Sequence, residues 1–83
     1  MQDAPLRVLA SGILFRAVLR AFPRAPSVEE KMRIHQLVEE RAWSLAPEQL
    51  ALADGRDVDD GPPVEWDGLV RALVGEALNT RAP

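Results

Sequence analysis

Apolar residues recur along most of the chain at intervals of three and four positions, which is the spacing of an amphipathic α-helix. Three longer segments, 4–22, 28–45 and 63–79, and a shorter one, 47–53, show this pattern. No segment alternates apolar and polar residues in the way that marks a half-buried strand. The pattern predicts an all-α fold, a small bundle of three longer helices plus one short helix, as a single domain over residues 1–83.

Local signals define the ends of these helices. Asp3 is placed to cap the first helix, and Pro23 ends it because proline cannot continue a helix. Ser27 and Glu30 have the spacing of a capping box, which starts the second helix. Residues 54–62 are rich in aspartate, glycine and proline, so we expect an acidic loop before the last helix.

The first helix is the most apolar segment, and its apolar residues fall into two stripes on a helical wheel. One stripe contains Val8, Phe15, Val18, Leu19 and Phe22. The other, on the opposite side of its N-terminal half, contains Leu6, Leu9 and Ile13. A helix at the edge of a small monomer needs only one apolar stripe. The second stripe therefore predicts contact with a partner, unless the three other helices together cover both.

Two further features, one in the second helix and one in the last, predict contacts outside the main apolar stripes. Met32 and Trp43 lie off the main apolar stripe of the second helix, which is typical either of a wide core face or of an exposed interface anchor. In the last helix, Gly68, Ala72 and Gly75 lie opposite the apolar stripe. Two glycines in an exposed helix cost about 2 kcal/mol relative to alanine. Either another backbone approaches this side closely, or the helix is marginally stable.

Composition and charge narrow the class of protein. The chain has no cysteine, which excludes a disulfide-stabilised scaffold and thiolate metal sites. Four arginines against one aspartate give residues 1–26 a charge of +3, whereas twelve acids against six bases give residues 27–83 a charge of −6. An acidic body is not typical of nucleic-acid binding, so nucleic acid is not an expected partner. The longest uncharged run, from Val8 to Phe15, is too short for a membrane span of about 20 residues. We expect a cytoplasmic protein without a membrane partner.

No residue spacing predicts a catalytic or metal site. The segment from Asp54 to Glu65 has the length of a twelve-residue calcium loop, but Val58 occupies a position that requires an oxygen ligand. His35 is the only histidine, and with Glu39 it would supply two metal ligands where a zinc site needs at least three. The glycines are scattered and form no phosphate-binding loop. We therefore expect no catalytic residue, metal or cofactor, and no enzymatic activity.

These patterns favour a non-catalytic helical protein–protein interaction module. It would act as a self-associating small accessory or regulatory subunit, whose partner is a second copy in a homodimer or a larger protein. The candidate interface residues are Leu6, Leu9, Ile13, Arg16, Arg20, Met32 and Trp43. Two alternatives remain. One is a small acidic inhibitor of the phage or mobile-element type that occupies a basic cleft of a nucleic-acid enzyme. The other is an oligomeric DNA-binding regulator that gathers the arginines of the first helix on one face.

Overall fold

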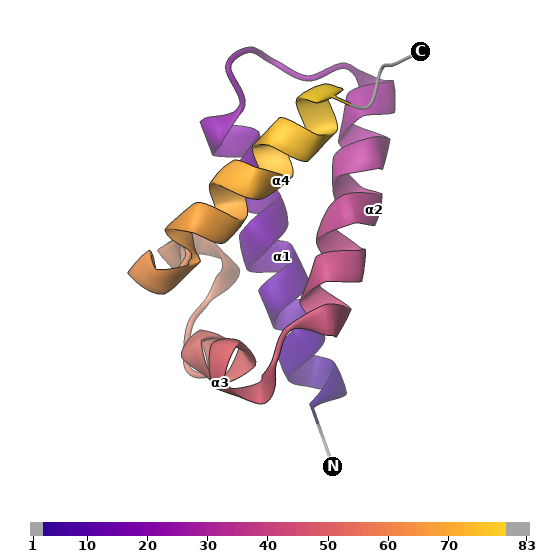
Figure 1. Cartoon of the computed structure of the whole chain (residues 1–83). Coiled ribbons are helices and arrows are strands. Elements are labelled where there is room, and N and C mark those ends of the chain that lie inside the picture. The colour runs from indigo at the N-terminus through magenta and orange to yellow at the C-terminus, as the bar shows by residue number, and fades with distance from the viewer. Residues whose placement is uncertain (1–2, 80–83) are drawn as a thin grey trace.

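The computed structural model describes residues 3–79, and helical segments account for all of its regular structure (Figure 1). No strand occurs within these residues, so the predicted all-α fold is confirmed. The helices are α1 (Ala4–Ala21), α2 (Val28–Ser44), α3 (Pro47–Leu50) and α4 (Asp67–Asn79). Three short 3₁₀ turns lie between them: η1 (Ala51–Ala53), η2 (Val58–Asp60) and η3 (Val64–Trp66).

The other elements pack around α1. The helix α2 returns antiparallel to it, and α4 crosses in front of α1 and ends beside the start of α2 (Figure 1). The short elements α3, η1 and η2 also contact α1. None of the described helices is long and apolar enough to cross a membrane.

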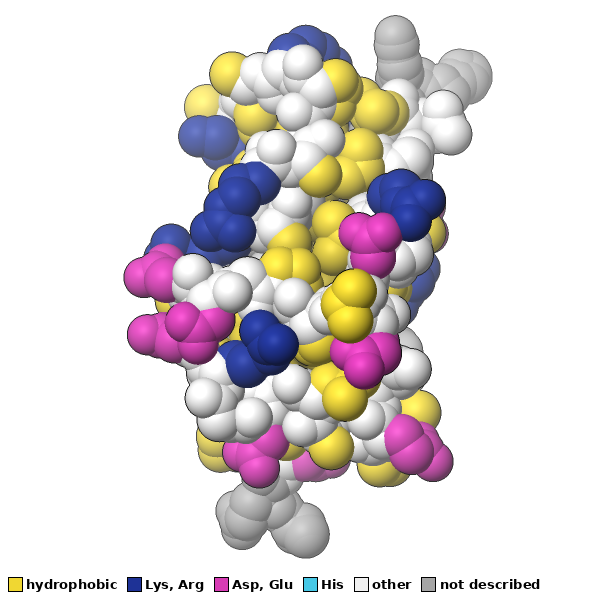
Figure 2. All heavy atoms as spheres, turned by 90° about the vertical axis from the view of Figure 1, so that its left-hand side faces the viewer, with side chains coloured by type: hydrophobic (Ala, Val, Ile, Leu, Met, Phe, Trp, Pro, Cys, Tyr) yellow, Lys and Arg dark blue, Asp and Glu magenta, His cyan; other side chains and the backbone are white. Residues whose placement is uncertain are grey.

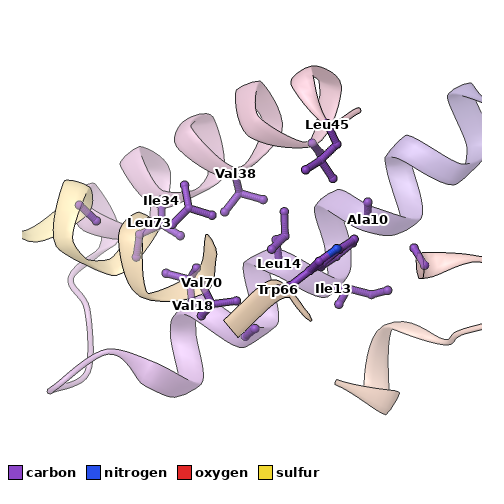
Figure 3. Close-up of a cluster of buried hydrophobic side chains, with 14 of the residues drawn as sticks. Ala10, Ile13, Leu14, Val18, Ile34, Val38, Leu45, Trp66, Val70 and Leu73 are labelled. Carbon is purple, nitrogen blue, oxygen red and sulfur yellow. The ribbon is translucent and has the colours of Figure 1, made fainter. Parts of the chain in front are cut away.

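The core is formed by the facing sides of these helices, with Trp66 as its largest buried side chain. Figure 3 shows this residue in one cluster with branched side chains of α1, α2 and α4. Its Nε1 donates a hydrogen bond to the backbone carbonyl of Gln49 at 3.3 Å, which links the start of the last helix to α3. Trp66 is thus a core residue that also fixes a neighbouring element.

The two predicted stripes of α1 are the edges of a single broad buried face. The centre of this face contains residues that belong to neither stripe: Ala10, Leu14 and Ala17. Ile13 has no exposed surface, and Leu6 and Leu9 are partly buried against the same core. The other helices therefore cover the second stripe, which corrects its interpretation as a partner surface. Val8, assigned to the main stripe, is instead 63% exposed.

The acidic loop folds back against α1 because one apolar residue anchors it. A Cβ placed on Gly12 would lie 3.0 Å from Cγ1 of Val58, so the glycine makes room for that side chain. In the same turn, Arg16 Nη1 donates to Asp59 Oδ1 at 2.8 Å. The glycine in the middle of α1 is thus explained by the close approach of the Val58 side chain.

The helix ends follow the local signals with one exception. Ser27 Oγ accepts a hydrogen bond from the Glu30 amide, and the Glu30 carboxylate accepts one from the Ser27 amide, which confirms the capping box. Asp3 occupies the N-cap position of α1 as predicted, but its side chain makes no hydrogen bond to the backbone of the first turn. Its carboxylate lies instead 3.3 Å from Arg7 Nη2, one turn further along the helix.

Candidate interaction surface on α2

The outer side of α2 combines exposed apolar residues with a regular helical spacing. This helix forms one outer edge of the molecule (Figure 1) and buries Ile34 and Val38 on its inner side. Val28, Met32 and Trp43 are exposed, Met32 by 67% and Trp43 by 50%. Positions four and eleven residues apart lie close to the same line along a helix, because eleven residues make about three turns. The outer face of α2 therefore carries apolar side chains near both ends.

Trp43 is held in place by an arginine from α1. The guanidinium carbon of Arg7 lies 5.9 Å from the centroid of the indole ring, in cation–π contact. Arg7 Nη1 also donates to the carbonyl oxygens of Ala42, at 2.9 Å, and Leu45, at 3.1 Å. Carbonyls at the C-terminus of a helix lack intrahelical partners and carry the negative end of its dipole, so a cation is stabilising there. One side of the indole thus rests on an arginine that three partners fix.

Sequence reasoning missed Arg7 as part of this site, treating it only as one positive charge among four. Nothing in the local sequence pairs it with carbonyls 35 and 38 positions away. The contact arises because α1 and α2 run antiparallel, which brings the start of one helix to the end of the other. With 12% of its side chain exposed, Arg7 is far more buried than the charge pattern indicates.

The α1 edge that borders α2 adds to this face. The ring of His35 meets the ring of Phe15 edge-on, with centroids 5.7 Å apart and an interplanar angle of 75°. Val8 lies two helical turns before Phe15 on the same side of α1, and it is exposed. Exposed apolar side chains of two helices thus lie along the same edge of the molecule.

Charges on the outer side of α2 are separated along its length. The N-terminal half exposes Lys31, Arg33 and His35, and the C-terminal half exposes Glu39 and Glu40. None of these five takes part in the ion pairs of residues 3–79. Glu29 is the exposed acid of the first turn, where a negative charge is favoured by the helix dipole. Beyond Glu29 in the first turn, the face therefore carries free basic groups in its N-terminal half and free acidic groups in its C-terminal half.

The other candidate residues of α1 do not join this face. Arg16 is paired with Asp59 of the loop. Arg20 is exposed and borders a cleft of about 260 Å³, which Pro62, Asp67 and Val70 also line. On the side of the molecule in Figure 2, basic, acidic and apolar side chains are mixed. Arg16 and Arg20 each have an acidic side chain nearby, Asp59 and Asp67 respectively.

Most of the arginines in the described structure bind acids of the same chain. Besides the pairs at Arg7 and Arg16, there are three more: Arg24–Glu30, Arg41–Glu76 and Arg71–Asp67. The Arg41–Glu76 pair, at 3.0 Å, joins α2 to α4, as expected of an arginine whose stem lies in an apolar stripe. The negative surface that remains free is smaller than the acidic residue count indicates.

The Arg24–Glu30 pair is bidentate. Both guanidinium nitrogens donate to the two carboxylate oxygens at 2.6 Å. These bonds, together with the bond from the Ser27 amide, lower the pKa of Glu30 from 4.5 to about 2. Both side chains line a cleft of about 960 Å³ between the start of α2 and the end of α4, together with Arg33. Two of the charged groups in this cleft are thus already paired with each other.

The small-residue side of α4 makes no close contact with the rest of the described chain. Apart from the adjacent residues and the backbone of α4 itself, no atom of residues 3–79 lies within 4 Å of a Cβ placed on Gly68 or Gly75. Of the two alternatives that these glycines left open, the close approach of another backbone is thus not made within residues 3–79. Within the same residues, no three histidine or acidic side chains converge in a way that would hold a metal ion.

No protein-family model matches the chain, and no curated protein or solved structure is significantly similar to it. Its class is that of a small all-α protein, and its function is inferred from the surface that its own residues form.

Proposed function

We propose that this protein is a non-catalytic interaction module that self-associates through the outer face of α2. In this role it would serve in the cytoplasm as a small accessory or regulatory subunit. The observation that carries the proposal is Trp43, which is half-exposed on a regular helix while one side of its ring rests on Arg7. Tryptophan is enriched among the residues that dominate binding energy at interfaces.

The fixed position of the indole favours binding. An aromatic side chain that is already immobilised loses little conformational freedom when a partner covers it. Three interactions of Arg7, with Asp3 and with two carbonyl oxygens, hold the surface on which the ring lies. The contact surface at this end of α2 is therefore formed before any partner arrives.

Burial of the exposed apolar surface supplies a driving force. The uncovered half of an indole corresponds to about 100 Å², which is worth about 2.5 kcal/mol at 25 cal/mol per Å². In a two-fold dimer each such contribution counts twice, because both copies use the same surface. Met32, exposed by 67%, adds to the same face.

The distribution of ion pairs supports this reading over the acidic inhibitor. Five acidic side chains, among them Glu30 and Asp59, are bound to arginines of the same chain. The free charges of α2 include both signs, whereas a protein that fills a basic cleft presents one sign of charge to it.

Light scattering over a range of concentrations tests the proposal. We expect the mass of the wild type to rise from 9.2 kDa towards twice that value, and Trp43→Ala to shift the midpoint to higher concentration. Val64→Ala is the matched control, because Val64 is 82% exposed but lies in η3, outside α2. A wild type that stays monomeric at every concentration contradicts the proposal.

A further inference from the structure

We propose that the partner is a second copy whose α2 lies antiparallel to the first across a two-fold axis. In this pairing, Met32 of each copy meets Trp43 of the other, and Arg33 of each copy faces Glu40 of the other. The inference rests on the proposed function and adds the orientation and register of the contact.

The apolar residues define the register. Met32 and Trp43 are eleven residues apart, so they differ by about 20° around the helix and by roughly 16 Å along it. If the two-fold axis passes between positions 37 and 38 of an antiparallel pair, Met32 of each copy lies against Trp43 of the other.

The charges define the direction. A two-fold antiparallel pair brings the basic half of one α2 against the acidic half of the other. Arg33 and Glu40 lie on one flank of the outer face, and His35 and Glu39 lie on the other, by their positions in the helical repeat. In the antiparallel pair the two-fold axis is perpendicular to both helices, so each flank faces the same flank of the second copy. Arg33 therefore meets Glu40, and His35 meets Glu39.

A parallel pair would have the opposite result. The two-fold axis would then run along the helices and bring opposite flanks together at the same height, with Glu40 against Glu39 and Arg33 against His35. Like charges placed opposite each other disfavour a complex. None of these side chains has an ion-pair partner within residues 3–79 that would neutralise it. The charge pattern of the free face therefore selects the antiparallel arrangement.

A contact built on one helix from each copy is small. It falls below the roughly 1,600 Å² of a standard protein–protein interface, so we expect reversible dimerisation with a dissociation constant in the micromolar range. At this affinity, substitutions can measurably raise or lower the dissociation constant.

Charge reversal tests the pairing. We expect Arg33→Glu and Glu40→Arg each to raise the dissociation constant by roughly tenfold or more, because each creates two like-charge contacts in the dimer. The double variant Arg33→Glu/Glu40→Arg restores the attraction and should return to within about threefold of the wild type. Single reversals without effect, or a double variant as weak as the singles, would overturn the register.

Cross-linking tests the direction, and the absence of native cysteine makes it clean. In the antiparallel register, residue 36 of one copy lies about 5 Å along the axis from residue 36 of the other, whereas residues 28 lie about 28 Å apart. We expect Gln36→Cys to form a disulfide dimer under mild oxidation and the matched control Val28→Cys to remain monomeric. Cross-linking of both variants indicates a parallel pair and overturns the inference.

The two proposals fail in different ways. If the wild type dimerises and Trp43→Ala weakens the dimer, but neither charge reversal nor cross-linking follows the pattern above, the surface stands and the antiparallel register is wrong. If the wild type remains monomeric at every concentration, both proposals are wrong. Melting curves of each variant establish that it is folded before its mass is interpreted.

Discussion

The helices α1 and α2 both carry more apolar residues than one stripe requires, yet the fold treats them differently. On α1 the surplus is internal, since Ile13 is fully buried and Leu6 and Leu9 pack against the core. On α2 the surplus stays outside, at Met32 and Trp43. The difference arises from position. Elements α2, α3, η1, η2 and α4 all contact α1, whereas α2 lies at an edge with its outer side uncovered. Surplus apolar surface therefore indicates a partner only on a helix that its own chain leaves uncovered.

The largest effect is expected from a charge at the centre of the buried helix. Ile13→Asp places a carboxylate without a partner among core side chains, which costs several kcal/mol, a large share of the 5–15 kcal/mol that stabilises a typical domain. We expect the variant to lose its helical circular dichroism at 25 °C. The same change at the exposed position, Met32→Asp, should leave the spectrum unchanged. If the Ile13→Asp variant folds and only fails to dimerise, Ile13 belongs to the dimer interface and not to the core.

A smaller effect is expected at the junction of the two helices. Arg7→Ala removes two hydrogen bonds to the end of α2 and the contact with Trp43, so it should lower the free energy of unfolding by about 2 kcal/mol. Urea denaturation measures this loss, and acrylamide quenching of fluorescence should show that Trp43 becomes more accessible while the buried Trp66 does not. Arg20→Ala is the control, because Arg20 is an exposed arginine of the same helix. Equal stability of the Arg7 and Arg20 variants would contradict this role.

The two mid-helix glycines should respond differently to the same substitution. Gly75→Ala should raise the free energy of unfolding by about 1 kcal/mol, because the methyl group meets no described atom within 4 Å and alanine has the higher helix propensity. Gly12→Ala should raise it less, because its methyl group lies 3.0 Å from Val58. In a Val58→Ala background the gain at Gly12 should approach that at Gly75, which a double-mutant cycle measures. Equal gains in the wild-type background would show that Val58 does not restrict Gly12.

The smallest effect is expected at the start of α2 and depends on pH. Because the pKa of Glu30 is lowered in the folded state, to about 2, its ionised form stabilises the fold. This contribution is fully present above the unfolded pKa of 4.5 and is lost as the pH falls towards 2. Glu30→Gln should therefore lower the melting temperature at pH 7, and its difference from the wild type should shrink between pH 4.5 and 2. Glu29→Gln, one residue away, is the control, and a difference that does not change with pH would rule out this linkage.

The sequence predicted the parts of the structure that depend on near neighbours. The capping box of Ser27 and Glu30 and the all-α fold follow from periodicity and from contacts a few residues apart. Asp3 is the N-cap residue of α1 as predicted, but its carboxylate binds Arg7, one turn away, and makes no capping hydrogen bond. The stripes of α1 failed because they left out Ala10, Leu14 and Ala17, which lie at the centre of the buried face and join the two stripes into one.

The candidate site was predicted in part. The positions of Met32 and Trp43 off the main stripe of α2 left open whether they were core or surface, and the structure places both at the surface. The support of Trp43 by Arg7 joins residues 36 positions apart, and no local pattern contains it. The same holds for the pairing of Arg16 with Asp59.

Taken alone, the sequence determined which segments are helical, where α2 begins, and that the chain has neither cysteine nor a second histidine. These properties depend on composition and on interactions within one or two turns. Only the tertiary structure decided which apolar residues are core and which remain outside. That decision depends on how many neighbours each helix receives, and α1 receives them on a broad face whereas α2 does not.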